Sequence, residues 1–366
     1  HSIKISPRIG GNMEKIKRNL NLQLLAEPNT QTTTTTGSGN DLSAEMKTYY
    51  DTELIEMAGP QLVHHQFGMQ KPIPKGKGKK IEFRKFSNFK KATTPLTEGV
   101  TPDGSKMNVT TIEKEVAQYG DYVTISDVLE LTAIDDFILE ATNKHGQNAG
   151  LTLDTICRNE INSGTNVRYA PKLADGTETE VTKRADMDAT CVLTPDLVAK
   201  AVADLKGNNA PKIDGSYIAI IHPFVAYDLM KSKEWIDVAI YADKERIFEG
   251  EIGKLRGVRF VETTEAKIWN DATCPIAKAA SDPDPAEYYS VFSTLFIGKD
   301  AYANVDVNGG GLEVIVKQKG SAGSADPLNQ RSTVGWKGIY AAKIRIPEYI
   351  VRVESVSAYS KTAEAN

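Results

Sequence analysis

The chain has 366 residues and a formal net charge of −4, with 25% charged and 40% hydrophobic residues. This length suits two domains or one large elaborated domain, and the composition is typical of a soluble globular protein. The acidic balance argues against a general nucleic-acid-binding domain, and no apolar run reaches the roughly 18 residues of a membrane span. We therefore expect a protein that stays in the cytoplasm where it is made, makes no membrane contact, and contacts DNA only locally and weakly.

The first 75 residues are expected to form little of the core. Residues 1–12 are interpreted as a leader, because Met13 opens a natural-looking start. The polar tract 28–41 cannot bury enough apolar surface to order itself, so we expect a flexible arm unless a neighbour holds it. A short amphipathic helix ending near residues 59–60 is predicted from four apolar residues at helical spacing: Met46, Tyr50, Leu54 and Met57.

Residues 76–126 are predicted to form one long β-hairpin. Its outgoing arm alternates, with Ile81 and Phe83 on one face, as expected of a strand. The segment 92–106 holds two prolines and two glycines, which indicates a turn-rich tip, and a β-branched return arm begins at Met107. About a dozen residues per arm would give the hairpin a reach of roughly 40 Å.

Charge is distributed unevenly along this hairpin. Residues 71–91 contain nine basic residues and one acid, whereas residues 92–136 contain nine acids and two lysines. Because an isolated two-stranded hairpin is only marginally stable, we expect an identical copy to support it through a head-to-tail contact, which builds rings or open lattices. The hypothesis pairs four bases of one subunit with three acids of the next: Lys79, Lys80, Arg84 and Lys85 with Glu98, Glu113 and Glu115.

A long helix is predicted over residues 135–163. Thr132 and Asp135 resemble a capping box, and residues 162–164 form a suitable C-terminal stop. Gly146 and Gly150 lie inside the helix, where each glycine costs about 1 kcal/mol relative to alanine. They predict either a bend or a close approach of another backbone.

The second half of the chain is predicted to be mixed. Within 190–275, Thr194 is the expected N-cap of a helix that ends at Gly207, and residues 216–223 form a buried strand of an α/β subdomain. Residues 286–319 suggest a β-meander, and residues 337–358 suggest two strands split at Pro347. Three cysteines without metal-site spacing are expected to be buried thiols: Cys157, Cys191 and Cys274.

Catalytic signatures are mostly absent from the sequence. It contains no phosphate-binding loop, no nucleophile elbow and no His-Glu-x-x-His motif. The adjacent His64 and His65 could bind a metal, but nothing nearby completes a site, and surface or packing roles are favoured. The acidic cluster 281–289 could bind calcium, although its prolines favour a solvated loop. The basic run 71–91 leaves a nucleic-acid-binding module as the alternative function. We expect no enzyme activity, cofactor or metal.

Several longer segments resemble one family. They are "ATTPLTEGVTPDGSKMNVTTIEKEVAQYGDYVTISDV" at 92–128, "AGLTLDTICRNEINSGTNVRYA" at 149–170 and "DPLNQRSTVGWKGIYAAKIRIPEYIVRVE" at 326–354. Together they are similar to major capsid proteins of tailed bacteriophages. The resemblance implies an α+β capsid fold with these parts: an N-terminal arm (13–75), an extended hairpin loop (76–126), a peripheral domain with a spine helix (127–189) and further strands (276–366), and an axial domain (190–275).

The resemblance also implies function and partners. Such chains assemble as hexamers and pentamers into an icosahedral shell around packaged DNA, and the extended loop lies over the adjacent subunit. A separate scaffolding protein is expected because only a short arm precedes the hairpin, and portal and decoration proteins are further expected partners. Relatives that crosslink use Lys and Asn positions that have no match in this chain, so we predict no crosslinks. The expected location is the virion, after assembly in the host bacterial cytoplasm.

Overall fold

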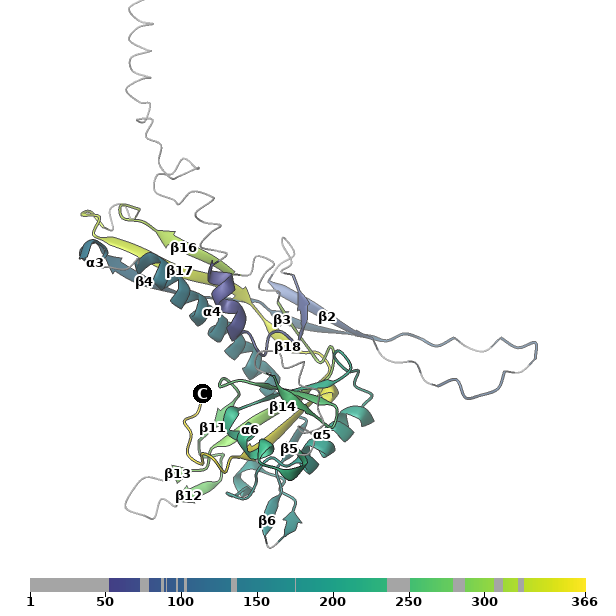
Figure 1. Cartoon of the computed structure of the whole chain (residues 1–366). Coiled ribbons are helices and arrows are strands. Elements are labelled where there is room, and N and C mark those ends of the chain that lie inside the picture. The colour runs from purple at the N-terminus through teal and green to yellow at the C-terminus, as the bar shows by residue number, and fades with distance from the viewer. Residues whose placement is uncertain are drawn as a thin grey trace, which may run out of the picture.

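The fold is organised around two hydrophobic cores. The computed structural model describes residues 53–72, 79–86, 89, 91–96, 98–101, 104–132, 137–174, 176–235, 251–278, 287–305, 312–321 and 326–366. Figure 1 shows an elongated body, a compact body and a hairpin that projects away from both. Within the described part of the chain, no helix is both long and apolar enough to span a membrane. The predicted leader, the flexible arm and the acidic loop at 281–286 lie outside the described residues.

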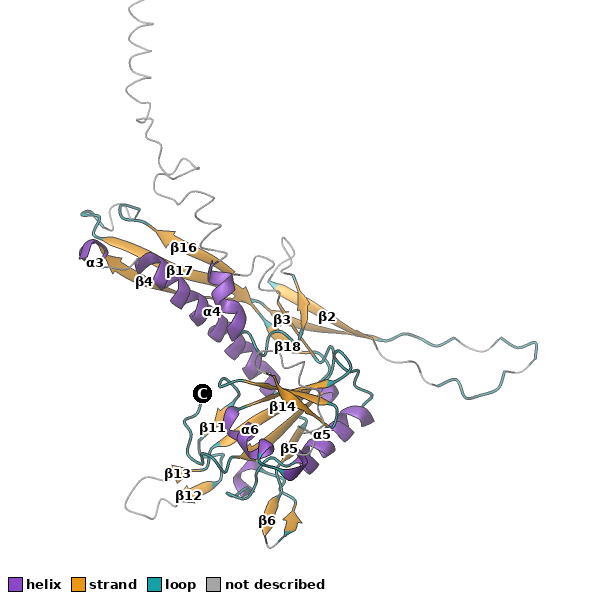
Figure 2. Ribbon diagram, viewed as in Figure 1, coloured by secondary structure: helices purple, strands orange, loops and turns teal. Residues whose placement is uncertain are grey.

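A long helix on a three-stranded sheet forms the elongated body. Helix α4 (Phe137–Asn162) lies along the antiparallel strands β16 (Leu312–Lys317), β17 (Arg331–Tyr340) and β4 (Ala117–Ser126) (Figures 1 and 2). Alternate residues of β17 face the helix, and the Trp336 indole Nε1 donates to the Asn148 side-chain oxygen at 2.9 Å. The predicted long helix is therefore confirmed with slightly different bounds. The expected cap residue Thr132 is instead the last residue of the short helix α3 (Asp127–Thr132), and Asp135 lies outside the described residues.

The compact body is built on a seven-stranded mixed sheet. Its strand order is β5-β19-β14-β8-β10-β9, with β11 added against β14. The bounds are β5 Val167–Tyr169, β19 Ile350–Val356, β14 Val291–Ile297, β8 Tyr217–Ile221, β10 Val258–Glu262, β9 Glu251–Leu255 and β11 Ile268–Trp269. Helices α5 (Pro195–Gly207) and α6 (Pro223–Met230) pack in the same core.

Strand β8 lies between the two cores, which explains its continuous run of apolar residues. Ile218 and Ile220 belong to the core of the elongated body, whereas Ala219 and Ile221 belong to the core of the compact body. Successive side chains of a strand point to opposite faces, so a strand that is covered on both faces must be apolar throughout. The predicted buried strand at 216–223 is confirmed.

Helix α5 begins and ends where its sequence predicts. Thr194 is the N-cap, and its hydroxyl accepts a hydrogen bond from the Leu197 backbone N–H at 3.3 Å. Pro195 occupies the first helical position, where its missing N–H costs nothing. The helix ends at Gly207. The apolar face predicted from spacing, including Leu197, Val198 and Leu205, is buried.

The predicted meander at 286–319 is wrong. Its three strands enter three different sheets: β14 joins the seven-stranded sheet, β15 (Tyr302–Val305) pairs with β1 (Met69–Lys71) and β18 (Ala342–Ile344), and β16 pairs with β17. The local alternation was sufficient to identify strands but not their partners. The split at Pro347 is confirmed, because a 3-10 turn at Pro347–Tyr349 separates β18 from β19.

Smaller elements complete the fold. The helix at 53–58 runs into a 3-10 turn (Gly59–Gln61), and a second 3-10 turn spans Arg184–Asp186. Two short hairpins project from the compact body (Figure 1): β6 (Lys172–Ala174) with β7 (Thr177–Thr179), and β12 (Ile276–Lys278) with β13 (Glu287–Tyr288). The three cysteines are free and buried, as predicted.

Candidate subunit interface

The projecting hairpin is shorter than predicted. Strands β2 (Lys80–Phe86) and β3 (Val109–Glu115) pair antiparallel along their full length, from Lys80 opposite Glu115 to Phe86 opposite Val109. The prediction that the hairpin continues to residue 126 is wrong. After Val116, strand β4 pairs with β17 over ten residues and places Ile125 in the core of the elongated body. That pairing is more favourable than continued pairing with the unsupported arm.

The base of the hairpin is supported by its own chain. The predicted alternation holds, and the apolar face of β2 packs into the core of the elongated body, with Ile81 only 4% exposed and Phe83 1% exposed. The expectation that the hairpin lacks support of its own is therefore wrong at its base. The described parts of the loop that joins β2 to β3 extend well away from the core (Figure 1).

The distal part of the hairpin carries exposed apolar side chains. We define the distal apolar residues as six side chains that are between 46% and 76% exposed: Phe86, Phe89, Leu96, Val100, Met107 and Val109. Six exposed apolar side chains within one projecting segment make it a candidate interaction site. Sequence reasoning emphasised charge in this segment and did not select these residues, although apolar residues within a polar, turn-rich stretch were a readable signal.

The charged candidates are partly paired within the chain. Lys80 and Glu113 lie 3.0 Å apart across the hairpin, and the Lys85 ammonium lies 3.4 Å from the Glu348 carboxylate. For the other four candidates, the described residues supply no ion pair: Lys79, Arg84, Glu98 and Glu115. The geometry thus brings Lys80 and Glu113 together inside one subunit. Pairing between subunits stays a prediction.

The two glycines of α4 lie where another backbone crosses the helix. A Cβ at Gly150 would lie 2.6 Å from the Ala58 carbonyl oxygen, and a Cβ at Gly146 would lie 2.9 Å from that of Leu54. Side-chain carbons are not found so close to a carbonyl, so only glycine fits here without a shift. Of the two explanations open from sequence, the structure shows the close approach.

His64 and His65 are packing residues in a buried polar network. The His64 Nδ1 lies 2.6 Å from an Asp154 carboxylate oxygen, and the other carboxylate oxygen accepts from the His64 and His65 backbone N–H groups at 2.6 and 3.2 Å. Burial raises the pKa of the neighbouring Cys157 thiol, which keeps it protonated and unreactive. Among the described residues, no group of three or more His, Cys, Asp or Glu side chains could hold a metal ion.

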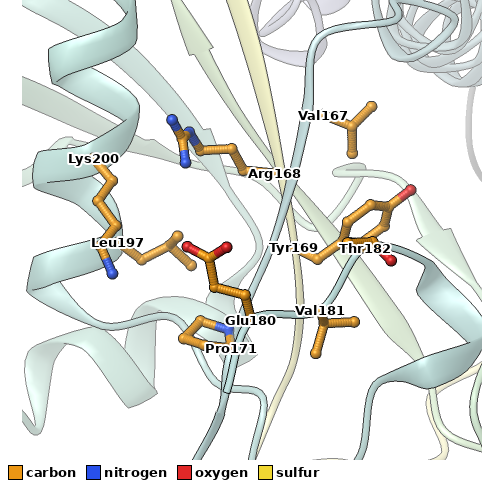
Figure 3. A pocket seen from close by; sticks show the side chains of 9 residues that line it. All are labelled: Val167, Arg168, Tyr169, Pro171, Glu180, Val181, Thr182, Leu197 and Lys200. Atoms are coloured by element: carbon orange, nitrogen blue, oxygen red, sulfur yellow. The ribbon is translucent and has the colours of Figure 1, made fainter. Parts of the chain in front are cut away.

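A cavity of about 300 Å³ lies between β5 and α5 (Figure 3). Its walls combine apolar residues such as Leu197 with the cations Arg168 and Lys200. Both cations already have carboxylate partners: Arg168 pairs with Asp204, and the Lys200 Nζ lies 2.8 Å from Asp196. The lining contains no nucleophile beside a general base, so the cavity does not suggest catalysis.

Comparison with known proteins assigns the chain. Residues 109–353, more than half of the chain, match the profile of the phage capsid protein family. The chain belongs to this family. The capsid protein is 26% identical over 235 residues to the major capsid protein of Pseudomonas phage KPP21. That match covers 57% of each protein, so the chain spans less than two thirds of the length of this curated relative.

Solved capsids share the fold of this capsid protein. The match to the capsid of Ralstonia phage GP4 covers 79% of this chain and 86% of the other, with a TM-score of 0.59 and 14% sequence identity. The match to the capsid of cyanophage P-SCSP1u covers 82% of this chain and 89% of the other, with a TM-score of 0.57 and 16% sequence identity. The predicted capsid fold is confirmed, and the relatives are structural virion proteins and not enzymes. The alternative of a nucleic-acid-binding module finds no support.

Proposed function

We propose that this capsid protein self-assembles into hexamers and pentamers that form an icosahedral shell around packaged phage DNA. The observation that carries the proposal is the hairpin, which projects from the body (Figure 1) and carries six exposed apolar side chains. Exposure of these apolar side chains to water does not stabilise a monomer, whereas an identical neighbour can bury them, which lowers the free energy. Because the hairpin and the surface that it covers differ, the contact is heterologous and continues from copy to copy.

The family assignment supports naming the parts. We assign the elongated body to the peripheral domain and the compact body to the axial domain, near the centre of each capsomer. The bounds differ from those expected from the sequence, because three strands outside 190–275 share the sheet of the compact body: β5, β14 and β19. Scaffolding and portal proteins, a decoration protein and weak non-specific contacts with packaged double-stranded DNA complete the proposed set of partners. Assembly takes place in the host bacterial cytoplasm.

Electron microscopy of a matched pair of variants tests this proposal. Replacing Leu96 and Val100 with aspartate removes two distal apolar residues, which are 76% and 63% exposed, without touching either core. We expect soluble, folded subunits and no particles. The control, Leu173→Asp, changes a residue that is 50% exposed on the short hairpin β6–β7 and should leave particles intact. Normal particles from the hairpin variant would contradict the proposal.

Charge reversal tests the electrostatic part separately. Exchanging Lys79, Lys80, Arg84 and Lys85 for glutamate should block particle formation while leaving folded protein. A single exposed ion pair contributes only about 0 to 1 kcal/mol, so one substitution should have a mild effect. If the fourfold variant forms normal particles but the Leu96/Val100 variant does not, the apolar contact suffices and the charge hypothesis is wrong.

A further inference from the structure

One carboxylate of the long helix, that of Glu160, contacts the hairpin. Glu160, near the C-terminal end of α4, accepts hydrogen bonds from two lysines on different elements. The Lys114 ammonium of β3 lies 3.1 Å from one carboxylate oxygen, and the Lys343 ammonium of β18 lies 2.9 Å from the other. The Glu160 side chain is only 15% exposed, so both contacts are partly shielded from water.

The carboxylate of Glu160 is held in its charged form. Burial alone would raise the pKa of Glu160, but the hydrogen bonds and charges of Lys343 and Lys114 outweigh burial and lower it. The ion pairs are therefore present throughout the neutral pH range.

Strand β3 has few other contacts with the body. Its side chains are exposed except for Ile112 and Lys114, which are half-buried. Strand β2 contributes the buried Ile81 and Phe83, so it packs firmly, whereas β3 contributes only the half-buried Ile112 to the same core and adds the ion pair of Lys114. The chain passes from β3 into β4 through the single residue Val116, which makes this junction the point where the hairpin changes direction.

We propose that Glu160 is the centre of an ionic clamp that sets the direction in which the hairpin leaves the body. With the clamp closed, Lys114 ties β3 to the end of α4, and Lys343 fixes Glu160 from the opposite side. Without the carboxylate charge, the apolar contacts of Ile81, Phe83 and Ile112 remain, but the paired strands lose their polar tie to α4 and tilt more freely at the junction beside Val116. The clamp acts within one chain and goes beyond the proposed assembly function.

The neighbouring ion pairs do not perform this role. Lys80 and Glu113 both lie on the hairpin, so their contact cannot fix it to the body. Lys85 and Glu348 do connect hairpin to body, but Glu348 is 55% exposed and the distance is 3.4 Å, which predicts a weaker and more strongly screened contact. Glu160 is the least exposed carboxylate among these three contacts.

A pair of spin labels measures the direction of the hairpin. Thr110→Cys places a label on β3, and Ala203→Cys places its partner on α5 in the compact body; both residues are exposed. The native cysteines are at most 1% exposed and should stay unlabelled: Cys157, Cys191 and Cys274. Dilution with unlabelled full-length protein removes distances between copies. Pulsed electron resonance then gives the distance distribution in the unassembled chain.

Glu160→Gln keeps the shape of the side chain and removes its charge. We expect the distribution of label-to-label distances to broaden and shift. The ratio of chains in the parent direction to chains in all other directions should fall by about fivefold, the equivalent of about 1 kcal/mol. Lys114→Met should have the same effect, whereas Lys343→Met should have less, because Lys114 keeps its partner. Circular dichroism should stay unchanged, which separates a loss of direction from a loss of folding.

The control lies on the same helix. Glu140→Gln removes an exposed ion pair with Lys144, 3.6 Å away, that does not involve the hairpin, and should leave the distribution unchanged. High salt should broaden the distribution of the unsubstituted labelled chain, which requires no charge variant at all. The clamp is refuted if Glu160→Gln and Glu140→Gln give the same distribution, whether or not particles form.

Discussion

Gly150 of the long helix lies directly against Ala58, so close that a Cβ would stand 2.6 Å from the Ala58 carbonyl oxygen. Replacing Gly146 and Gly150 together with alanine should force the helix at 53–58 away from α4. Helix propensity favours alanine by up to about 1 kcal/mol at each position, but overpacking costs typically 1–3 kcal/mol, so we expect net destabilisation. We also expect lower particle yield or altered particle size. Thermal unfolding and electron microscopy measure the two effects.

Gly59→Ala is the matched control for this pair. A Cβ at Gly59 would meet nothing within 4 Å, so the melting temperature should change little. An equal change in Gly59→Ala and in the double variant would show that the effect does not come from the helix crossing.

His222 should make the compact body sensitive to acid. It caps α6, where its Nδ1 accepts from the Phe224 N–H at 3.1 Å, and burial lowers the pKa of His222 to about 4. The unfolded chain, with an ordinary pKa near 6.5, binds a proton first, so this contribution to stability is complete above pH 6.5 and is lost as the pH falls towards 4. The loss should be on the order of 2 kcal/mol.

Denaturant titrations at pH 7 and pH 4.5 measure this loss. His222→Asn is the sharpest comparison, because asparagine is a strong N-cap residue but does not titrate in this range. Its stability should depend less on pH than that of the parent protein. An unchanged pH dependence would assign the acid sensitivity to carboxylates elsewhere.

Removing the Glu354 carboxylate should lower the stability of the compact body more than removing any other single carboxylate there. It is fully buried and accepts from Arg184 at 2.7 and 2.8 Å, while Arg352 lies 3.0 Å away. Glu354→Gln leaves two partly buried guanidinium groups facing each other, and breaking a buried pair costs about 3–5 kcal/mol. Because Arg184 stacks over the Trp269 ring at 3.9 Å, tryptophan fluorescence should also change.

The exposed pair of Arg256 and Glu234 provides the comparison. Its atoms lie as close, at 2.7 Å, but the side chains are 45% and 54% exposed. Urea titrations of both variants measure the free energy of unfolding, and Glu234→Gln should lower it by less than about 1 kcal/mol. Similar costs at the two sites would mean that burial does not decide the strength of these pairs.

Local features of the structure were predictable from the sequence, because residues that are neighbours in the chain determine them. The Thr194 cap, the stop at Gly207 and the two-faced burial of β8 follow from capping chemistry and from side-chain alternation. The pairing of β4 with β17 was not predictable, because more than 200 positions separate Ala117 from Tyr340 and many strands have compatible alternation. The same limit produced the wrong hairpin length and the wrong meander.

The candidate interface was partly predictable for the same reason. Alternation placed Ile81 and Phe83 on one face, but nothing in the sequence indicated that the chain covers this face itself. Counting charges suggested pairs between subunits, yet Lys80 meets Glu113 of its own hairpin. Lys114 and Glu160 are 46 positions apart, and no motif joins them. Such contacts depend on how the tertiary structure brings separate segments together.

The place of β19 in the seven-stranded sheet determines when a new chain can finish folding. Residues 350–356 lie between β5 and β14 and pair with β14 along all seven positions. Until the ribosome has released Val356, β5 lacks its partner strand and one edge of β14 stays unpaired, so the sheet is incomplete. Only a polypeptide translated beyond Val356 can complete this sheet, so we expect products that terminate earlier to stay incompletely folded.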